Sequence, residues 1–311
     1  MNSFAKLGLE AQLHERLEQL RLLFDLDELK DQGNSNASIR KYYEDSRLGY
    51  YLVHSRNGAM HMALNPAGEF DEGGYAGQAH LVAERLSPTT RDVLELASGN
   101  GFNLELLAQM RPDIRFTGID LVPEQVKRAD EKLEHLANAS TKVGDFQDLA
   151  FEDAAFDLVF VVESLCHAID LPRALSEVHR VLRPGGRFIV IDAWRSDVFS
   201  QRPTEVRTAA AYAESAMAVP YARELGAWKS AAIDASFDIT EDLDLSDEIM
   251  PNLERLARVA ESRFVAHPVR ARVLKKLLPT ALVTNAVAGY LMPLTVRLRA
   301  HTYRMVVLTR V

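Results

Sequence analysis

The stretch Val93-Leu-Glu-Leu-Ala-Ser-Gly-Asn-Gly-Phe-Asn103 (VLELASGNGFN) decides the fold of this chain. Its first half is apolar, as in a buried strand, and its second half is rich in small, turn-forming residues. Gly99 and Gly101 permit positive φ and let the backbone pass close to a ligand. The stretch predicts a buried strand, a tight loop that holds a ligand, and the start of a helix.

Strand-like and helix-like segments alternate on the C-terminal side of this stretch. We expect strands at 92–97, 115–121, 157–162 and 187–194, and helices at 102–110, 123–138 and 171–182. Such alternation implies right-handed βαβ crossovers and a parallel sheet, so the fold class is α/β. The β-branched run at 302–311 is a candidate for a final strand.

Helical patterns flank this core on both sides. The residues Leu9, Leu13, Leu17, Leu20 and Phe24 are spaced as on an amphipathic helix within 1–30, and further helices are expected at about 75–87, 204–218 and 247–264. The residues 277–296 are uncharged over a length that could span a bilayer, but two prolines, an Asn, three Thr and a Gly interrupt the run. We therefore expect a buried helix or the apolar wall of a pocket there.

Composition limits the classes of function. The 311 residues are 47% hydrophobic and 26% charged, with 44 acidic against 36 basic residues and a net charge of −8, so nucleic acid is a poor candidate partner. The single cysteine, Cys166, excludes an internal disulfide and a Cys-rich metal cluster, and no metal site is predicted. Together with a start that lacks a basic-then-apolar leader, this predicts a cytoplasmic protein.

Acidic residues mark the ends of successive strands: Glu95 lies near the end of the first, Asp120 at the end of the second, and Asp145 after the strand that follows. Glu95 would repel a pyrophosphate but could accept hydrogen bonds from a ligand amine, and Leu104 stands where a dinucleotide fingerprint needs its third glycine. Asp120 could chelate both hydroxyls of a ribose. Asp145 could accept a hydrogen bond from an adenine amino group while Phe146 packs on the ring. Taken singly, Asp120 could instead cap a helix and Asp145 could be a turn residue.

In this combination the sequence resembles the class I S-adenosylmethionine-dependent methyltransferases, over roughly residues 42–194. VLELASGNG is similar to their glycine loop, GIDLVPEQV to their ribose segment, GDFQDLAFEDAAFDLV to their adenine segment, and EVHRVLRPGGRFIVID to their late helix, turn and strand. Ala97 departs from the pattern because it replaces the first glycine of the loop.

The resemblance implies a Rossmann-like seven-stranded sheet with helices on both faces, an antiparallel final strand, an N-terminal helical segment and a C-terminal helical cap. It implies S-adenosylmethionine as the cofactor, with a methionine end near Glu95 and the backbone from Ala97 through Gly99 to Gly101. The remaining cofactor residues that it implies are Asp120 and Leu121 for the ribose, Asp145 and Phe146 for the adenine, and Tyr43.

The candidates for catalysis follow the later strands. Glu163 and His167 lie four residues apart and are expected on one face of a helical turn, and Asp192 ends the strand at 187–194. The stretch is similar to one in sterol, tocopherol and ubiquinone-pathway C-methyltransferases, where the acid at Glu163 would be a base or cation partner. It is also similar to one in sugar O-methyltransferases, where His167 and Asp192 would form a base pair. His167 could instead bond only a backbone carbonyl, and Glu163 could only orient the cofactor.

The flanking segments resemble the acceptor-binding parts of the sterol and tocopherol enzymes. The aromatic segment KYYEDSRLGYYLVHSRNGAMHMAL resembles their lid, with Tyr43 and His61 as candidates, and DLDLSDEIMPNLERL resembles their cap. Trp194 is a further candidate for substrate binding. With the uncharged run at 277–296, these features favour an apolar acceptor: a terpenoid, sterol-like, prenylated or polyketide molecule.

The leading hypothesis is therefore a methyltransferase, favouring C-methylation, that acts on a lipophilic small molecule, with residues 1–74 as helix and lid, 75–194 as cofactor core, 195–300 as cap and late sheet elements, and 301–311 as final strand. The alternatives are an O-methyltransferase of a secondary metabolite or its sugar, a catalytically inactive cofactor-binding subunit, and an NAD-dependent reductase. Contact with a membrane without spanning it, and a homodimer through the first helix, are further hypotheses.

Overall fold

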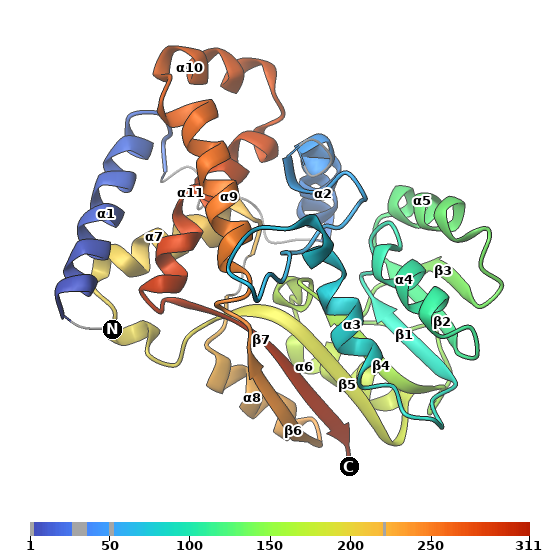
Figure 1. Cartoon of the computed structure of the whole chain (residues 1–311). Coiled ribbons are helices and arrows are strands. Elements are labelled where there is room, and N and C mark those ends of the chain that lie inside the picture. The colour runs from blue at the N-terminus through green and yellow to red at the C-terminus, as the bar shows by residue number, and fades with distance from the viewer. Residues whose placement is uncertain (1–2, 27–35, 50–52, 220–221) are drawn as a thin grey trace.

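The computed structural model describes residues 3–26, 36–49, 53–219 and 222–311 (Figure 1). Within 36–49, the side chains of residues 36–39, 43, 47 and 48 lie outside this description.

A seven-stranded sheet with the order β3-β2-β1-β4-β5-β7-β6 forms the centre of the molecule (Figure 1). The neighbours from β3 to β5 pair in parallel, and β7 is antiparallel to both β5 and β6. The predicted Rossmann-like sheet with an antiparallel final strand is confirmed. The strands are β1 (Asp92–Leu96), β2 (Arg115–Asp120), β3 (Ala139–Val143), β4 (Phe156–Val162), β5 (Leu182–Arg195), β6 (Phe237–Asp244) and β7 (His301–Arg310).

Helices cover both faces of the sheet and build a separate cap at one end (Figure 1). The α-helices are α1 (Ser3–Arg21), α2 (Asn36–Gly49), α3 (Gly77–Ala83), α4 (Phe102–Met110), α5 (Pro123–Leu133), α6 (Leu171–Val181), α7 (Thr204–Ala216), α8 (Leu225–Asp234), α9 (Met250–Ala260), α10 (Pro268–Leu277) and α11 (Thr280–Arg297). Short 3-10 turns are η3 (Glu72–Ala76), η4 (Leu165–His167) and η5 (Phe199–Gln201), and η6 (Glu261–Val265) is a π-helical turn.

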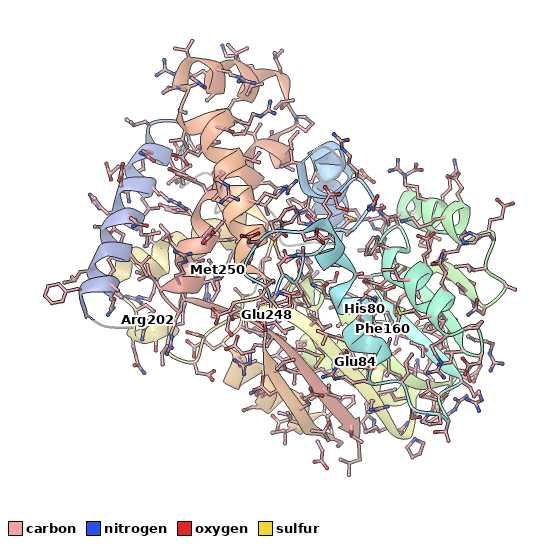
Figure 2. All side chains as sticks on the ribbon, viewed as in Figure 1. His80, Glu84, Phe160, Arg202, Glu248 and Met250 are labelled. Atoms are coloured by element: carbon pink, nitrogen blue, oxygen red, sulfur yellow. The ribbon has the colours of Figure 1, made fainter. Side chains whose placement is uncertain are left out.

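The central strands are apolar on both faces because both faces are covered. Along β4, Phe160 packs toward α3, α4 and α5, whereas its neighbours Val159 and Val161 pack toward α6 and α8 (Figure 2). In the same view, His80 and Glu84 mark the course of α3 over the sheet. This two-sided burial explains why β1, β4 and β5 were recognisable from sequence as short apolar runs.

The cap consists of α1, α7, α9, α10 and α11, which share one apolar cluster. The leucine stripe of α1, represented by Leu13, Leu17 and Leu20, is buried inside this cluster. The uncharged run forms α11, which packs against α7 and α9, so the prediction of a buried helix holds. No helix in the described ranges is both long and apolar enough to cross a membrane.

Several elements differ from the sequence prediction. The first helix ends at Arg21 rather than near residue 30. The late helix begins at Met250, after the turn that contains Glu248 (Figure 2), and passes through η6 rather than continuing as one α-helix to 264. Strand β6 was not predicted as a strand, because its sequence FDITEDLD is acidic and mostly exposed at the sheet edge.

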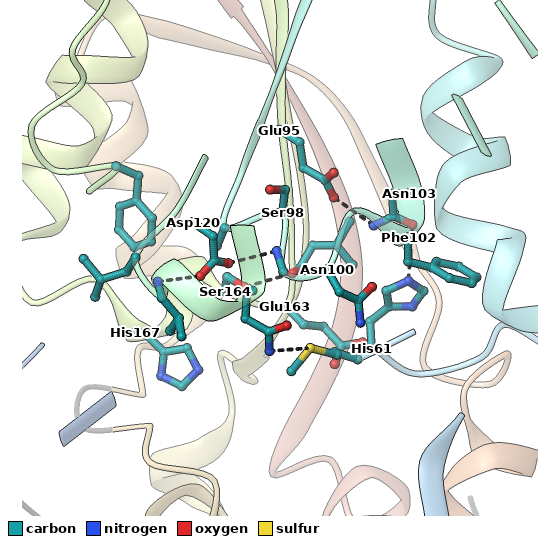
Figure 3. Close-up of a pocket in the computed structure, with 18 of the residues that line it drawn as sticks. His61, Glu95, Ser98, Asn100, Phe102, Asn103, Asp120, Glu163, Ser164 and His167 are labelled. Atoms are coloured by element: carbon teal, nitrogen blue, oxygen red, sulfur yellow. Dashed lines mark hydrogen bonds between the residues drawn. The ribbon is translucent and has the colours of Figure 1, made fainter. Parts of the chain in front are cut away.

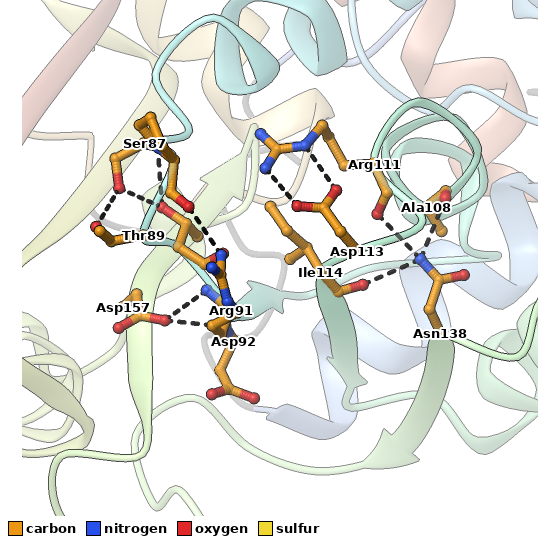
Figure 4. Close-up of polar contacts among 12 residues, drawn as sticks. Ser87, Thr89, Arg91, Asp92, Ala108, Arg111, Asp113, Ile114, Asn138 and Asp157 are labelled. Atoms are coloured by element: carbon orange, nitrogen blue, oxygen red, sulfur yellow. Dashed lines mark hydrogen bonds and ion pairs between the residues drawn. The ribbon is translucent and has the colours of Figure 1, made fainter.

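Side-chain hydrogen bonds tie the loops together at the amino ends of the parallel strands, opposite the glycine loop (Figure 4). The Asp157 carboxylate accepts hydrogen bonds from the backbone amides of Arg91 and Asp92, at 2.7 and 3.0 Å. The Nδ2 atom of Asn138 lies within 3.0–3.2 Å of three carbonyl oxygens, those of Ala108, Arg111 and Ile114. One amide group thereby holds the end of α4 to the start of β2.

We expect Asn138→Ala to lower the free energy of unfolding by about 1–3 kcal/mol, because it leaves half-buried carbonyls without their donor. Urea unfolding followed by circular dichroism measures this change. The matched control is Asp113→Ala, which removes only the exposed ion pair with Arg111 and should cost less than about 1 kcal/mol. Equal costs for the two variants would contradict the role given to Asn138.

Candidate functional site

Two adjoining cavities open at the carboxyl ends of the parallel strands, where open α/β sheets place their ligands. The first encloses about 990 Å³ and the second about 1090 Å³, open mouths included. Met60, Glu163 and His167 line both, so these three side chains form the boundary between the two spaces.

The first cavity gathers most residues that the sequence assigned to a cofactor (Figure 3). Those that line it are Glu95, Ala97, Gly99, Asp120, Leu121, Asp145 and Phe146. Gly101 does not line it. It adopts φ of +78° at the start of α4, and an added Cβ would lie 3.1 Å from the Cβ of Ala129 on α5. This glycine serves the turn and the packing of the two helices.

The loop from β1 to α4 is strained at Ala97, which adopts φ of +51°. This left-handed region costs a residue with a Cβ about 1–2 kcal/mol, which explains why glycine is usual at this position in the resembling proteins. Gly99 also has a positive φ, of +54°, and an added Cβ there would meet only Met60 Sδ, at 3.5 Å. The loop thus keeps an open backbone surface toward the cavity.

Glu95 is a buried acid with one unsatisfied oxygen. Its Oε1 accepts a hydrogen bond from Nδ2 of Asn103 at 2.9 Å, while Oε2 has no hydrogen-bond partner among the described residues (Figure 3). Burial raises the pKa of Glu95 to about 8, against the hydrogen bond from Asn103 and with help from the charge of Asp120. Since buried acceptors are rarely left without a donor, Oε2 fits a ligand donor such as an amine.

The two later acids are held by backbone amides. Asp120 accepts hydrogen bonds from the amides of Gly99 and Val122, both at 2.8 Å, which ties the end of β2 to the glycine loop. Asp145 Oδ1 accepts from the amide of Gln147 at 2.9 Å. Both carboxylates line the cavity in fixed orientations, as a site that reads hydroxyl and amino groups requires.

The segment before η3 covers the first cavity. His61 is buried, and its Nε2 lies 3.2 Å from Oδ1 of Asn103, so His61, Asn103 and Glu95 form one hydrogen-bonded chain (Figure 3). Sequence reasoning placed His61 in the acceptor pocket, but the structure puts it on the first cavity. Met60 lies beside it and reaches both spaces.

Glu163 lies at the junction of the cavities. It follows β4 with φ of +47°, and its Oε1 accepts hydrogen bonds from the amide of Met62 and the hydroxyl of Tyr303, both at 2.7 Å. Its Oε2 bonds to none of the described residues. Burial raises the pKa of Glu163 to about 7, against these two hydrogen bonds.

His167 and Asp192 are close in the fold but not joined by a hydrogen bond. His167 ends the 3-10 turn η4, not a turn of α-helix, and its Nδ1 lies 3.0 Å from the carbonyl oxygen of Ala218. Asp192 lines only the second cavity and accepts from the amides of Ala193 and Cys166, at 2.8 and 3.1 Å. The O-methylating alternative, in which His167 and Asp192 together act as the catalytic base, therefore stays a prediction.

The second cavity has mostly apolar walls. Trp194, a predicted substrate-binding residue, lines it and meets Trp228 edge-on, with ring centroids 5.1 Å apart. Further apolar walls come from Met60, Met62, Leu165, Met217, Val219, Ile249, Met292 and Val296. One polar cluster lies among them: Arg195 donates twice to Glu214, at 2.8 and 2.6 Å, and Nε2 of His301 lies 3.0 Å from the same carboxylate.

The side chain of Tyr43, a predicted cofactor residue, lies outside the described part of the chain. Its neighbour Tyr42 lines the second cavity and donates a hydrogen bond to Oδ1 of Asn285 on α11, at 2.7 Å.

Sequence reasoning missed two side chains of the site. Tyr303, on β7, donates to Glu163 and accepts from Nε2 of Gln78 at 3.1 Å. The alternation along TYRMVVLTRV could have placed it on an inward face, but not opposite Glu163. Asn103, two residues past Gly101, was visible only as the polar start of an apolar helix.

Several buried groups make the stability depend on pH. Burial raises the pKa of the carboxyl groups of Glu95, Glu163 and Asp192, to about 8, 7 and 6. A group with a raised pKa contributes stability at low pH and loses it as the pH rises through the folded value. Burial lowers the pKa of three histidines, His54, His61 and His167, to about 4. Below pH 6.5 these histidines have the opposite effect, because they make the stability rise as the pH rises.

Above pH 6.5 the three buried histidines no longer contribute a slope, and the raised pKa values of Glu95 and Glu163 remain, so we expect the unfolding temperature of the ligand-free protein to fall as the pH rises from 6.5 toward 8. Differential scanning calorimetry at a series of pH values measures this slope. Glu95→Gln, which stays neutral, should flatten it. A melting temperature that rises over the same range would contradict the assignment.

Comparison with known proteins supports this geometry. Residues 94–190 match the family described as "Methyltransferase domain". Sterol 24-C-methyltransferase of Kluyveromyces lactis is 27% identical over 220 residues, 66% of this chain, and the chain spans 58% of that relative's length. The S-adenosyl-L-methionine-dependent Diels-Alderase iccD of Talaromyces variabilis is 28% identical over 234 residues, 70% of this chain and 78% of that protein.

Among solved structures, the [4+2]-cyclase SpnF superposes with a TM-score of 0.71 at 20% identity, covering 89% of this chain and 97% of the other, which shows a shared fold. The domain match covers β1 through most of β5, the part that carries the glycine loop and the acids of the first cavity. Residues 94–190 thus match a methyltransferase domain, and the chain is similar in sequence and in fold to S-adenosylmethionine-dependent enzymes.

Proposed function

We propose that the chain binds S-adenosylmethionine in the first cavity and transfers a methyl group to a carbon of a lipophilic acceptor in the second. The observation that carries this proposal is that the two cavities meet at Glu163, an acid with one oxygen free of hydrogen bonds to the described residues. The first cavity presents acceptors for the amino, ribose and adenine groups of the cofactor, and the second is mainly apolar.

The residues of the first cavity suit the cofactor group by group. The unsatisfied Oε2 of Glu95 would accept from the α-amino group, Asp120 from the ribose hydroxyls and Asp145 from the adenine amino group. When bound, S-adenosylmethionine supplies a methyl group activated by a sulfonium. The chain then has to hold the acceptor in line with the methyl group and exclude water. The lid segment with Met60 and His61 excludes water by covering the first cavity.

Glu163 is the group suited to finish a C-methylation. When an alkene carbon of the acceptor gains a methyl group, its neighbour becomes cationic, and loss of a proton restores the double bond. An ionised Glu163 stabilises that cation and takes the proton on Oε2, while Oε1 stays bonded to Met62 and Tyr303. Its pKa of about 7 allows both protonation states near neutral pH.

The apolar lining favours acceptors with hydrocarbon skeletons, such as terpenoid, sterol-like, prenylated or polyketide molecules. The likeness to the sterol 24-C-methyltransferase of Kluyveromyces lactis supports this class of acceptor. The chain spans only 58% of that relative's length, so the main support for an apolar acceptor is the lining of the second cavity.

A second candidate reaction is a cyclisation of a bound polyene without methyl transfer. It is favoured by the likeness to iccD, whose name is that of an S-adenosyl-L-methionine-dependent Diels-Alderase. The same cavities would serve, with the cofactor as a fixed part of the wall. Mass spectrometry separates the two reactions, because methylation adds one CH₂ to the acceptor and cyclisation leaves its mass unchanged.

Cofactor binding is tested by calorimetric titration with S-adenosylmethionine, S-adenosylhomocysteine and NADH. We expect the two sulfur ligands to bind and NADH not to bind. Glu95→Gln should weaken binding of both by about 10- to 100-fold, since an amide replaces the charged acceptor of the amino group. Asp120→Ala should also weaken it. Glu124→Gln, on the exposed side of α5, is the control. Unchanged affinity in Glu95→Gln would remove Glu95 from the site.

Catalysis is tested with labelled methyl groups and a panel of prenylated and sterol-like acceptors. Glu163→Gln should lower turnover by about 10²- to 10⁴-fold with little change in cofactor affinity. Tyr303→Phe keeps the carboxylate but removes a bond that holds its pKa down, so the acid limb of the rate profile should move to higher pH. Tyr290→Phe, whose hydroxyl bonds Gln19 in the cap, is the control. Full turnover in Glu163→Gln would exclude Glu163 as the base.

A further inference from the structure

The segment from Ser262 to Thr280 has a composition unlike the rest of this acidic chain. It contains Arg263, Arg270, Arg272, Lys275 and Lys276 but no acidic residue, although the whole chain carries a net charge of −8. Helix α10 lies within it and occupies the outermost position of the cap, far from the sheet (Figure 1). Four of the five basic residues of this segment thus lie on one projecting helix.

Helix α10 exposes an apolar face. Val269, Val273 and Leu277 are spaced by four residues, which places them on one side of the helix, and they are 74%, 52% and 74% exposed. Ala271, on the opposite side, is buried in the cap. The outward side chains of α10 stand clear of the other elements in Figure 2.

A contact on the inner side fixes how the helix is oriented. Lys275 donates a hydrogen bond to the carbonyl oxygen of Leu23 at 2.6 Å, and its ammonium lies 4.9 Å from the ring centroid of Phe24. This contact fixes the side of α10 that faces the cap and leaves the Val269–Leu277 side outward.

Cations flank the apolar face on both sides. By the helical period, Arg270 lies along one side of the Val269–Leu277 stripe, and Arg272 and Lys276 lie along the other. All three are exposed, and none forms an ion pair or hydrogen bond with a residue that the structure describes. Their charges face solvent without a counter-charge from the described part of the chain.

We propose that α10 is an interfacial helix that docks the protein on an anionic lipid bilayer, with Val269, Val273 and Leu277 inserted and Arg270, Arg272 and Lys276 on the head groups. An apolar stripe bordered by cations matches the layering of a membrane interface, where acyl chains lie beneath anionic head groups. A self-associating face would instead bring these cations against the same cations of a second copy.

If the second cavity binds a lipophilic acceptor, as in the proposed function, docking through α10 also bears on how that acceptor is reached. The docking itself does not depend on the proposed function. Helix α10 connects α9 with α11, and the second cavity is lined by Ile249 at the start of α9 and by Met292 and Val296 on α11. These residues lie at the ends of α9 and α11 that are distant from α10, so docking would hold the protein at the bilayer in which lipophilic acceptors dissolve, with the cavity set back from the surface along these two helices.

The test is co-sedimentation of the whole protein with vesicles of phosphatidylcholine alone or mixed in equal parts with phosphatidylglycerol. We expect pelleting with the mixed vesicles only, weakened by added salt. Val273→Glu with Leu277→Glu should abolish it, and Arg272→Gln with Lys276→Gln should lower the partition coefficient by about 5-fold per charge removed. Ile233→Glu, at an equally exposed apolar position on α8, and Lys127→Gln, on α5, are the matched controls and should pellet as the wild type does.

A second readout locates the contact. A tryptophan at the most exposed stripe position, Val269→Trp, should show a blue shift of its emission with mixed vesicles and none with phosphatidylcholine, after subtraction of the signal of the buried Trp194 and Trp228. Thermal unfolding at the wild-type temperature confirms that each variant is folded.

Three results would overturn the proposal: no pelleting of the wild type, equal pelleting of the Val273/Leu277 variant, or the absence of a blue shift. If gel filtration shows a dimer that the Val273/Leu277 variant dissociates while the vesicles have no effect, the face belongs to a second copy. Because these measurements need neither cofactor nor acceptor, their failure leaves the proposed methyl transfer untouched.

Discussion

The architecture of the site depends on one half-buried carboxylate. Glu163 follows the central strand β4 in a left-handed conformation, and its Oε1 joins the lid through the amide of Met62 and the last strand through the hydroxyl of Tyr303. Three segments that are distant in sequence therefore meet at one oxygen atom. Since a half-buried acid without donors would be costly, this pairing also holds the lid in the position that divides the space into two cavities.

The first cavity shows how a small set of bonds orients several functional groups. Asp120 fastens the glycine loop through Gly99, and Asn103 links the carboxylate of Glu95 to the lid residue His61. Each acid thus has part of its hydrogen-bonding capacity used for structure and part left toward the cavity. The unsatisfied Oε2 of Glu95 is the clearest case, because a monomer without ligand gains nothing from burying it.

The sequence was sufficient where chemistry and local pattern coincide. The central strands are apolar runs, and Gly99, Asp120 and Asp145 lie at strand ends in the expected order, so the sheet and the first cavity could be predicted. Long-range register could not: the partnership of Tyr303 with Glu163 spans 140 positions, and only the pairing of β5 with β7 determines it. Strand β6 escaped because an exposed, acidic edge strand lacks the apolar signal that marks the others.

The C-terminal cap contains two helices whose apolar residues have different surroundings, the buried α11 and the partly exposed α10. The uncharged run that became α11 is long enough to suggest a bilayer span, yet α7 and α9 bury it and its residues line the second cavity. Helix α10 is shorter and far more charged, but Val269, Val273 and Leu277 are exposed on one side of it. Its cations Arg270, Arg272 and Lys276 have no ion pair or hydrogen bond with the described residues. Length alone would direct a search for membrane contact to the wrong helix. The distribution of apolar and basic residues around the helix axis is the property that matters, because a bilayer surface is itself layered in the same order.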